Sequence, residues 1–115
     1  MVISCVPAHL RQLVGILLDN AGKYASSGGE TLVTLRRSAH KRCLLEVSDR
    51  GEPLSREELQ NIFKRFYRGD KVRTMNRSYG LGLSIAQSIA NEHCGRIWAE
   101  SAGGYNRFLV ELPCL

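Results

Sequence analysis

Four alternating segments in two close pairs limit most strongly what this chain can fold into. Polar and apolar residues alternate, as in half-buried strands, over residues 30–38, 42–49, 96–101 and 106–112. Helical segments separate the two pairs, and the regular strand–helix–strand alternation of a doubly wound sheet is missing. We therefore expect an α/β fold, a two-layer sandwich of helices on a mainly antiparallel sheet.

Three segments carry helix signals. The first has apolar residues at helical spacing and stops at Ser26-Ser27-Gly28-Gly29. Its predicted core positions are Leu10, Val14, Leu17, Leu18 and Ala21. The second begins at Ser55, a predicted N-cap with Glu58 as its capping-box partner, and runs through Phe63. The third begins at Gly80-Leu81-Gly82-Leu83, and Gly95 is placed to end it. Its predicted apolar stripe consists of Gly82, Ile85, Ala86, Ile89, Ala90 and His93.

Length and composition indicate one globular domain, at residues 1–115, with 43% apolar and 23% charged residues. No apolar run is long enough to span a membrane, and the four cysteines and three histidines lack zinc-site spacing. The net charge of +5 resides in residues 64–77, where six basic residues stand against Asp70 alone. Such a segment predicts a polyanion partner, a triphosphate or a nucleic acid, or else a solvated loop.

A carboxylate ends the apolar face of the second strand. Cys43, Leu45 and Val47 share that face with Asp49, because side chains alternate along a strand. A carboxylate on a buried face needs a hydrogen-bond donor, and the exocyclic amine of adenine is one. Gly51 would let the backbone approach a base, although Asp-x-Gly is also a common plain turn.

Two further features suit a nucleotide. At about 100° per residue, Asn20, Lys23 and Tyr24 share a face of the first helix with Ile16. An amide oxygen suits Mg²⁺, an ammonium suits phosphate and a phenol ring suits a base. The turn Gly80-Leu81-Gly82 offers N–H groups at a helix N-terminus, where anions bind. Each feature alone is also explained by a solvated helix edge or a tight turn, and their combination is what indicates a site.

In this order the segments resemble the ATP-binding catalytic domain of bacterial sensor histidine kinases, within the wider family of DNA gyrase B, Hsp90 and MutL. Residues 17–24 look like the N box, Asp49-Arg50-Gly51 like the start of the G1 box, residues 62–68 like the F box, and residues 80–86 like the G2 box. The resemblance covers nearly the whole chain. It implies a Bergerat-type fold with a mixed, mainly antiparallel sheet, about three helices and a mobile ATP lid at roughly residues 67–79.

The resemblance also implies roles for the matching residues. Asn20 would bind Mg²⁺, Lys23 would contact phosphate, and Asp49 would accept a hydrogen bond from adenine. Arg65 or Arg68 would stabilise the transferring phosphoryl group, which makes the catalytic set Asn20, Lys23, Arg65 and Arg68. The other nucleotide-binding residues would be Tyr24, Gly51, Leu54, Phe66, Gly80, Leu81, Gly82, Leu83 and Phe108.

The implied function is that of a protein histidine kinase domain, which takes Mg-ATP and donates its γ-phosphoryl group to a histidine on a separate dimerisation domain. A response regulator would act downstream. None of His9, His40 and His93 has the sequence context of such an acceptor, so we expect the dimerisation domain elsewhere in a longer, membrane-anchored sensor. The present domain would be cytoplasmic, monomeric, inactive alone and without nucleic-acid partners.

Two departures from the family pattern leave alternatives open. Ile16 stands where the family has Asn or Glu, which predicts poor stand-alone ATP hydrolysis. Pro53 replaces the second glycine of Asp-x-Gly-x-Gly and removes an N–H. The alternatives are a degenerate nucleotide-binding scaffold with a regulatory role, an anti-sigma-type serine kinase, which the F box disfavours, and a nucleic-acid module built on residues 64–77.

Overall fold

The computed structural model describes residues 2–24, 30–64 and 79–115. The helices are α1 (Pro7–Tyr24), α2 (Arg56–Asn61) and α3 (Tyr79–Glu92). The strands are β1 (Thr31–Ala39), β2 (Arg42–Arg50), β3 (Arg96–Ala102) and β4 (Tyr105–Pro113). The four predicted strands are confirmed to within one residue at each end. Most of the predicted ATP lid lies outside the described residues.

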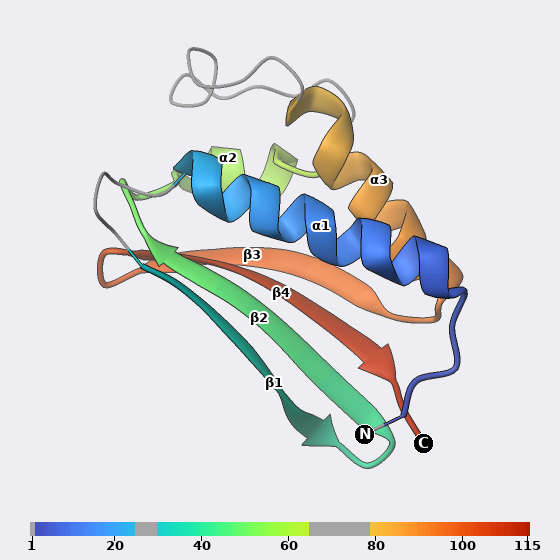
Figure 1. The fold of residues 1–115 in the computed structure, drawn as a ribbon. Coiled ribbons are helices and arrows are strands. Elements are labelled where there is room, and N and C mark those ends of the chain that lie inside the picture. The colour runs from blue at the N-terminus through green and yellow to red at the C-terminus, as the bar shows by residue number, and fades with distance from the viewer. Residues whose placement is uncertain (1, 25–29, 65–78) are drawn as a thin grey trace.

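The sheet has the order β1-β2-β4-β3, and each of its three described pairings is antiparallel. All three helices cover one face of it, so that the molecule is a two-layer sandwich (Figure 1). The predicted fold class is thereby confirmed, although the described strands include no parallel pair. The β3–β4 turn consists of Gly103 and Gly104 with φ of 62° and 83°, the positive values that a tight hairpin of this type requires.

The helix ends follow local signals. Pro7 occupies the first position of α1, where its missing N–H costs no hydrogen bond. At α2 the predicted capping box is confirmed: Ser55 Oγ accepts from the Glu58 N–H at 3.0 Å, and Glu58 Oε1 accepts from the Ser55 N–H at 3.1 Å. The helix ends at Asn61 rather than Phe63. In the described residues no helix is long and apolar enough to cross a bilayer.

The predicted core faces of two helices are partly wrong. In α1, Leu13 is fully buried whereas Leu18 is 44% exposed. In α3, Leu83 is buried whereas Ile85 is 38% exposed. The reason is that α1 and α3 pack against each other as well as on the sheet, which rotates the buried stripe of each helix toward its neighbour.

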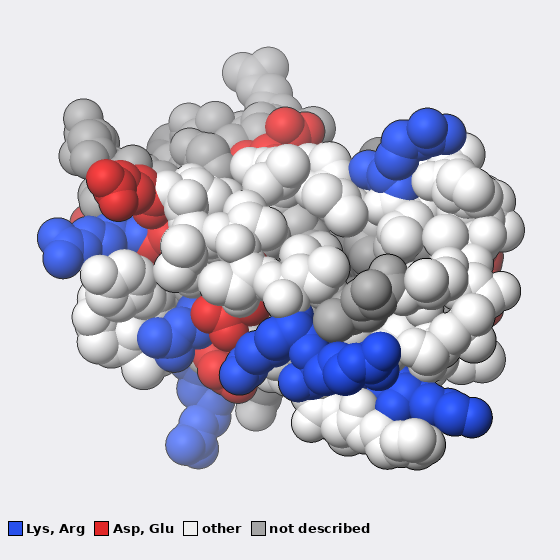
Figure 2. All heavy atoms as spheres, turned by 60° about the horizontal axis from the view of Figure 1, so that its bottom comes forward, with Lys and Arg blue, Asp and Glu red and all other residues white. Residues whose placement is uncertain are grey.

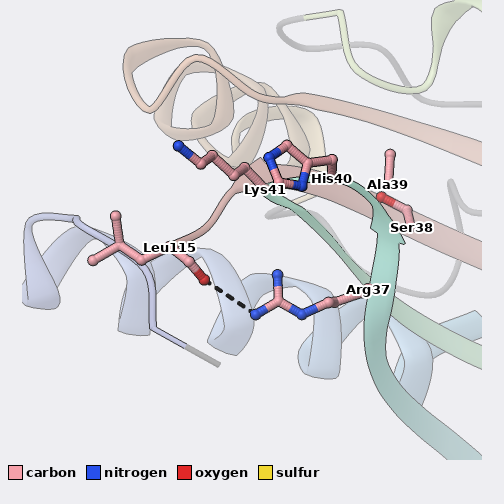
Figure 3. Close-up of a pocket in the computed structure, with 6 residues that line it drawn as sticks. All are labelled: Arg37, Ser38, Ala39, His40, Lys41 and Leu115. Atoms are coloured by element: carbon pink, nitrogen blue, oxygen red, sulfur yellow. Dashed lines mark hydrogen bonds between the residues drawn. The ribbon is translucent and has the colours of Figure 1, made fainter.

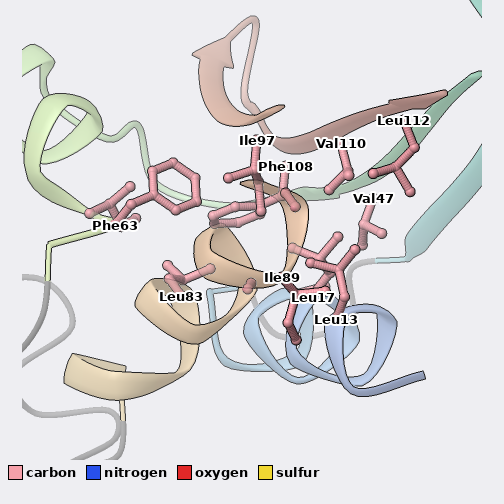
Figure 4. Packing of buried hydrophobic residues seen from close by; sticks show 14 of the residues in the cluster. Leu13, Leu17, Val47, Phe63, Leu83, Ile89, Ile97, Phe108, Val110 and Leu112 are labelled. Carbon is pink, nitrogen blue, oxygen red and sulfur yellow. The ribbon is translucent and has the colours of Figure 1, made fainter. Parts of the chain in front are cut away.

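The core lies between the helices and the sheet. Leu13 and Leu17 of α1 meet Leu83 and Ile89 of α3 over the strands, as Figure 4 shows. Apolar residues that are directly opposite across the strands form the sheet side of this core, in rows such as Val47, Phe108 and Ala99. Full burial of a Val, Leu, Ile or Phe side chain contributes roughly 1.5–3 kcal/mol, and such burial is the main stabilising term of the fold.

The uncovered face of the sheet carries paired charges. Glu111 accepts from Arg42 at 3.2 Å and lies 3.4 Å from Arg96 Nε, and Arg107 lies 3.8 Å from Glu46. Figure 2, turned toward this side, shows basic side chains with acidic ones among them. The described part of this face therefore carries charges of both signs.

The end of α3 differs from the prediction. Cys94, not Gly95, takes the left-handed conformation, with φ of 59°. The N–H of Gly95 donates to Ala90 O at 2.8 Å and that of Cys94 to Asn91 O at 3.1 Å, which is the hydrogen-bond pattern of a Schellman motif. Gly95 is needed for another reason: a Cβ there would overlap the Glu111 carbonyl oxygen and lie 2.6 Å from Leu112 Cδ2.

We predict that Gly95→Ala lowers the free energy of unfolding by about 1–3 kcal/mol, because the new methyl group must displace the backbone of β4. Gly15→Ala is the matched control. Its Cβ would have no neighbour within 4 Å, and alanine favours a helix interior by about 1 kcal/mol. Urea unfolding of both variants measures the difference. Equal stability of the two would contradict the close approach of β4 to Gly95.

Candidate functional site

One end of the sheet carries a row of polar side chains. Thr31, Asp49, Asn106 and Ser101 are directly opposite one another across β1, β2, β4 and β3. They continue, on the helix-covered face, the columns of apolar residues that form the core. We call these four residues the polar row. The C-terminal ends of α1 and β2 and the helix α2 lie at the same end of the sandwich (Figure 1).

Asp49 is the most unusual member of the polar row. Its side chain is 1% exposed, and neither carboxylate oxygen has a hydrogen-bond partner in the described part of the chain. Burial raises its pKa from an ordinary 3.8 to about 6, because a low-dielectric surrounding disfavours the charged form. The predicted burial of Asp49 is thereby confirmed. Because buried carboxylates without hydrogen-bond partners are rare, this one points to a ligand that donates a hydrogen bond.

Asn20 is a second buried polar residue with an unsatisfied atom. It is 2% exposed, and its Nδ2 donates to the Ile16 carbonyl oxygen at 2.9 Å. This bond fixes the amide, and Oδ1 is left without a partner among the described residues. An oriented amide oxygen of this kind is a suitable ligand for a hard cation such as Mg²⁺.

Residues 51–54, which follow β2, are tied to the β3–β4 hairpin through their backbone. The N–H of Gly51 donates to Gly104 O at 3.2 Å, and the N–H of Leu54 donates to Ser101 Oγ at 3.0 Å. The carbonyl of Glu52 accepts from Asn106 Nδ2 at 3.0 Å. The backbone beside Asp49 is therefore held in place, and Pro53, which has no N–H, leaves no donor unsatisfied.

The other predicted site residues fall into four groups. Leu54, Leu83 and Phe108 are buried in the hydrophobic core. Gly82 lies in α3 on the side that faces α1, where a Cβ would be 3.6 Å from Ile16 Cγ2. Four lie in helix ends of which the structure describes the backbone: Lys23 and Tyr24 in the last turn of α1, Gly80 and Leu81 in the first turn of α3. Arg65, Phe66 and Arg68 lie outside the described residues.

Ser101 and Asn106 are not among the predicted site residues. Asn106 is 1% exposed and is the residue two positions before Phe108 on the same face of β4. The alternation that places Phe108 on the buried face also places Asn106 there, and this is the signal that identified Asp49 on β2. Its hydrogen-bond partners Glu52 and Ser101 belong to other segments of the chain, and no local sequence pattern predicts these hydrogen bonds.

Two hollows on the described surface lie away from the polar row. One surrounds the β1–β2 turn at the opposite end of β2, where an Arg37 guanidinium nitrogen donates to Leu115 O at 3.1 Å (Figure 3). The other is an apolar hollow on the outer side of α1, between Cys5 and Leu18. Neither contains a residue that sequence analysis assigned to the site.

Comparison with known proteins gives one family. Residues 5–115 match the family described as histidine kinase-, DNA gyrase B-, and HSP90-like ATPase. Sensor histidine kinase TrcS of Mycobacterium tuberculosis is 38% identical over 114 residues, which are 94% of this chain and 22% of that protein. Sensor protein DltS of Streptococcus agalactiae is 36% identical over 106 residues, 92% of this chain and 27% of that one.

Solved structures that resemble this chain also include histidine kinases. The mycobacterial sensor histidine kinase MprB has a TM-score of 0.89 at 27% identity, covering 96% of this chain and 76% of that one. Full-length ShkA in complex with AMPPNP has a TM-score of 0.76 at 26% identity, covering 91% and 21%. The chain spans about a quarter of the length of the curated relatives.

The described part of the chain, a four-stranded antiparallel sheet covered by three helices, matches the fold of a solved sensor histidine kinase structure. The chain belongs to the histidine kinase-, DNA gyrase B- and HSP90-like ATPase family. Within it, this is the ATPase domain of a two-component sensor histidine kinase.

We predict that Asp49 makes stability depend on pH. Because burial favours the neutral form, the folded state keeps a proton that the unfolded chain releases between pH of about 4 and about 6. The free energy of unfolding therefore falls as the pH rises through this window. Asp49→Asn should remove this part of the fall and be the more stable protein above it, by about 1.4 kcal/mol per unit of pKa difference.

Denaturant unfolding across that window checks this prediction. Asp19→Asn is the control for the loss of one carboxylate, because Asp19 is exposed on α1. If Asp49→Asn and wild type kept the same slope, the carboxylate would ionise as readily in the fold as in the unfolded chain.

Proposed function

We propose that this domain binds Mg-ATP at the polar row and donates the γ-phosphoryl group to a histidine on a separate dimerisation domain of the same protein. The buried Asp49 carboxylate, without a partner in the described residues, carries this proposal. It needs a donor, and the exocyclic amine of adenine provides an N–H. The solved structure of the similar protein ShkA is in complex with AMPPNP, which supports an adenine nucleotide as the ligand.

The second orphaned atom fits the metal that accompanies ATP. Asn20 would hold Mg²⁺ through Oδ1, because its Nδ2 is already engaged with Ile16 O. Bound there with the phosphates, the cation would neutralise charge on the triphosphate. The domain's own contribution is to orient the amide oxygen before the metal arrives.

Transfer itself requires position and positive charge more than covalent chemistry. The bond between the γ-phosphorus and its bridging oxygen breaks, a bond to the acceptor imidazole nitrogen forms, and ADP leaves. Lys23, Arg65 and Arg68 are the predicted sources of positive charge. The acceptor histidine, the downstream response regulator and a membrane-anchored parent are inferred from the named relatives, which are sensor kinases.

A second candidate function is that of a regulatory scaffold, which binds nucleotide but does not transfer its phosphoryl group. One residue, Ile16, favours it. Ile16 is partly buried against the core and offers no polar group to orient a nucleophile beside Asn20. The scaffold and the kinase share nucleotide binding and differ in transfer.

Binding is tested by calorimetric titration with ADP and a non-hydrolysable ATP analogue, with and without Mg²⁺. We expect a Kd between about 1 µM and about 1 mM for the wild type. Asp49→Asn should weaken binding at least about tenfold with or without metal, since the amide is uncharged and has a donor in place of one of the two acceptor oxygens. Asn20→Ala should lose only the part of the affinity that Mg²⁺ adds.

Asn61→Ala is the matched control for Asn20. Asn61 makes the same bond, from Nδ2 to the carbonyl of the residue four positions earlier, at 2.8 Å on α2, and its loss should not change binding. A wild-type protein that binds neither nucleotide would contradict the proposal for both the kinase and the scaffold.

Transfer is tested by joining this domain to the histidine-bearing domain of its own parent sensor and supplying γ-labelled ATP. Label on the histidine supports the kinase. Nucleotide binding without label supports the scaffold. Label on a serine would support the anti-sigma-type alternative.

A further inference from the structure

The amide of Asn106 is occupied by partners on both sides. Its Nδ2 donates to the Glu52 carbonyl at 3.0 Å, and its Oδ1 accepts from Ser101 Oγ at 2.7 Å. Ser101 Oγ also accepts from the Leu54 N–H. One hydroxyl therefore fixes both the orientation of the Asn106 side chain and the backbone of residue 54.

Asp49 lies next to this amide and is not bonded to it. Asp49 and Asn106 are directly opposite on β2 and β4, and the Cβ atoms of such a pair are about 5 Å apart. An amide at that separation is within reach of a carboxylate. Yet both oxygens of Asp49 lack a partner in the described part of the chain, because Glu52 and Ser101 hold the amide in another direction.

We propose that Ser101 and Asn106 are positioning residues of the nucleotide site, which keep the Asn106 amide off the Asp49 carboxylate and hold the loop of residues 51–54, so that the preference for adenine depends on them. This inference rests on the proposed function, since it concerns how Asp49 is kept ready for the base.

Removing the Ser101 hydroxyl has two consequences. The N–H of Leu54 loses its acceptor, so that the loop of residues 51–54 keeps fewer hydrogen bonds to the β3–β4 hairpin. The Asn106 amide loses one of its two partners and can turn to donate to Asp49. A carboxylate that already accepts from an amide has less to gain from the adenine amine, and its charged form is stabilised.

The test compares Ser101→Ala with Ser101→Thr, which keeps a hydroxyl, and with Ser38→Ala. Ser38 is the control because its hydroxyl bonds to Glu111 at 2.9 Å at the far end of the sheet. The affinities for ADP and GDP are measured for each protein. We expect Ser101→Ala to weaken ADP binding about tenfold, the effect of losing one or two hydrogen bonds, and to lower the ADP:GDP preference. Ser101→Thr and Ser38→Ala should retain both.

A second readout needs no nucleotide. The pKa of Asp49, followed by NMR of its carboxyl carbon, should fall in Ser101→Ala and stay at the wild-type value in Ser101→Thr. Asn106→Ala separates the two parts of the proposal. It releases the Glu52 carbonyl and weakens ADP binding, but it removes the competing amide, so the pKa of Asp49 should not fall.

These readouts distinguish the outcomes. Ser101→Ala that unfolds more easily but keeps its ADP affinity, its preference and the Asp49 pKa would reduce Ser101 to a purely structural role and overturn the inference. A wild type that binds no ADP would overturn the proposed function, while the NMR titration would still decide whether Ser101 and Asn106 control the state of Asp49.

Discussion

The burial of the Asp49 carboxylate without a hydrogen-bond partner in the described residues is the constraint on which the site depends. A charge in that place opposes folding, and the apolar columns that lead up to it along β2 and β4 supply the stabilisation that holds it there. The buried carboxylate therefore destabilises the fold, whereas the proposed site needs it as a hydrogen-bond acceptor. A ligand that donates to Asp49 would relieve the conflict, which gives the domain a physical reason to bind one.

Strand register determines which side chains meet in the polar row. A slip of one residue in any strand would move its member of the row to the uncovered face and replace it with a neighbour. The register of β3 on β4 is set by the turn at Gly103 and Gly104, directly beside the row. The positions of Ser101 and Asn106 relative to each other are thus fixed, because they lie next to a turn whose geometry allows one register of β3 on β4.

The strands and the capping box of α2 could be predicted because their signals are local: alternation, a turn, and a Ser–Glu pair three residues apart. The rotation of α1 and α3 could not, since periodicity defines an apolar stripe but not the neighbour it faces, and Leu18 and Ile85 are exposed as a result. Asp49 was predicted as buried from alternation. Ser101 and Asn106 were missed because their partners Leu54 and Glu52 are 47 and 54 residues away in the chain.

That long separation has a consequence for how the domain is made. On the ribosome, α1, the first hairpin and the loop after Asp49 emerge well before β3 and β4. Until Asn106 has been translated, the backbone groups of Gly51, Glu52 and Leu54 lack their partners in the β3–β4 hairpin, and the polar row is incomplete. A ligand of the row therefore cannot rescue a chain whose translation stopped earlier. Such a ligand would stabilise only domains in which the row is complete.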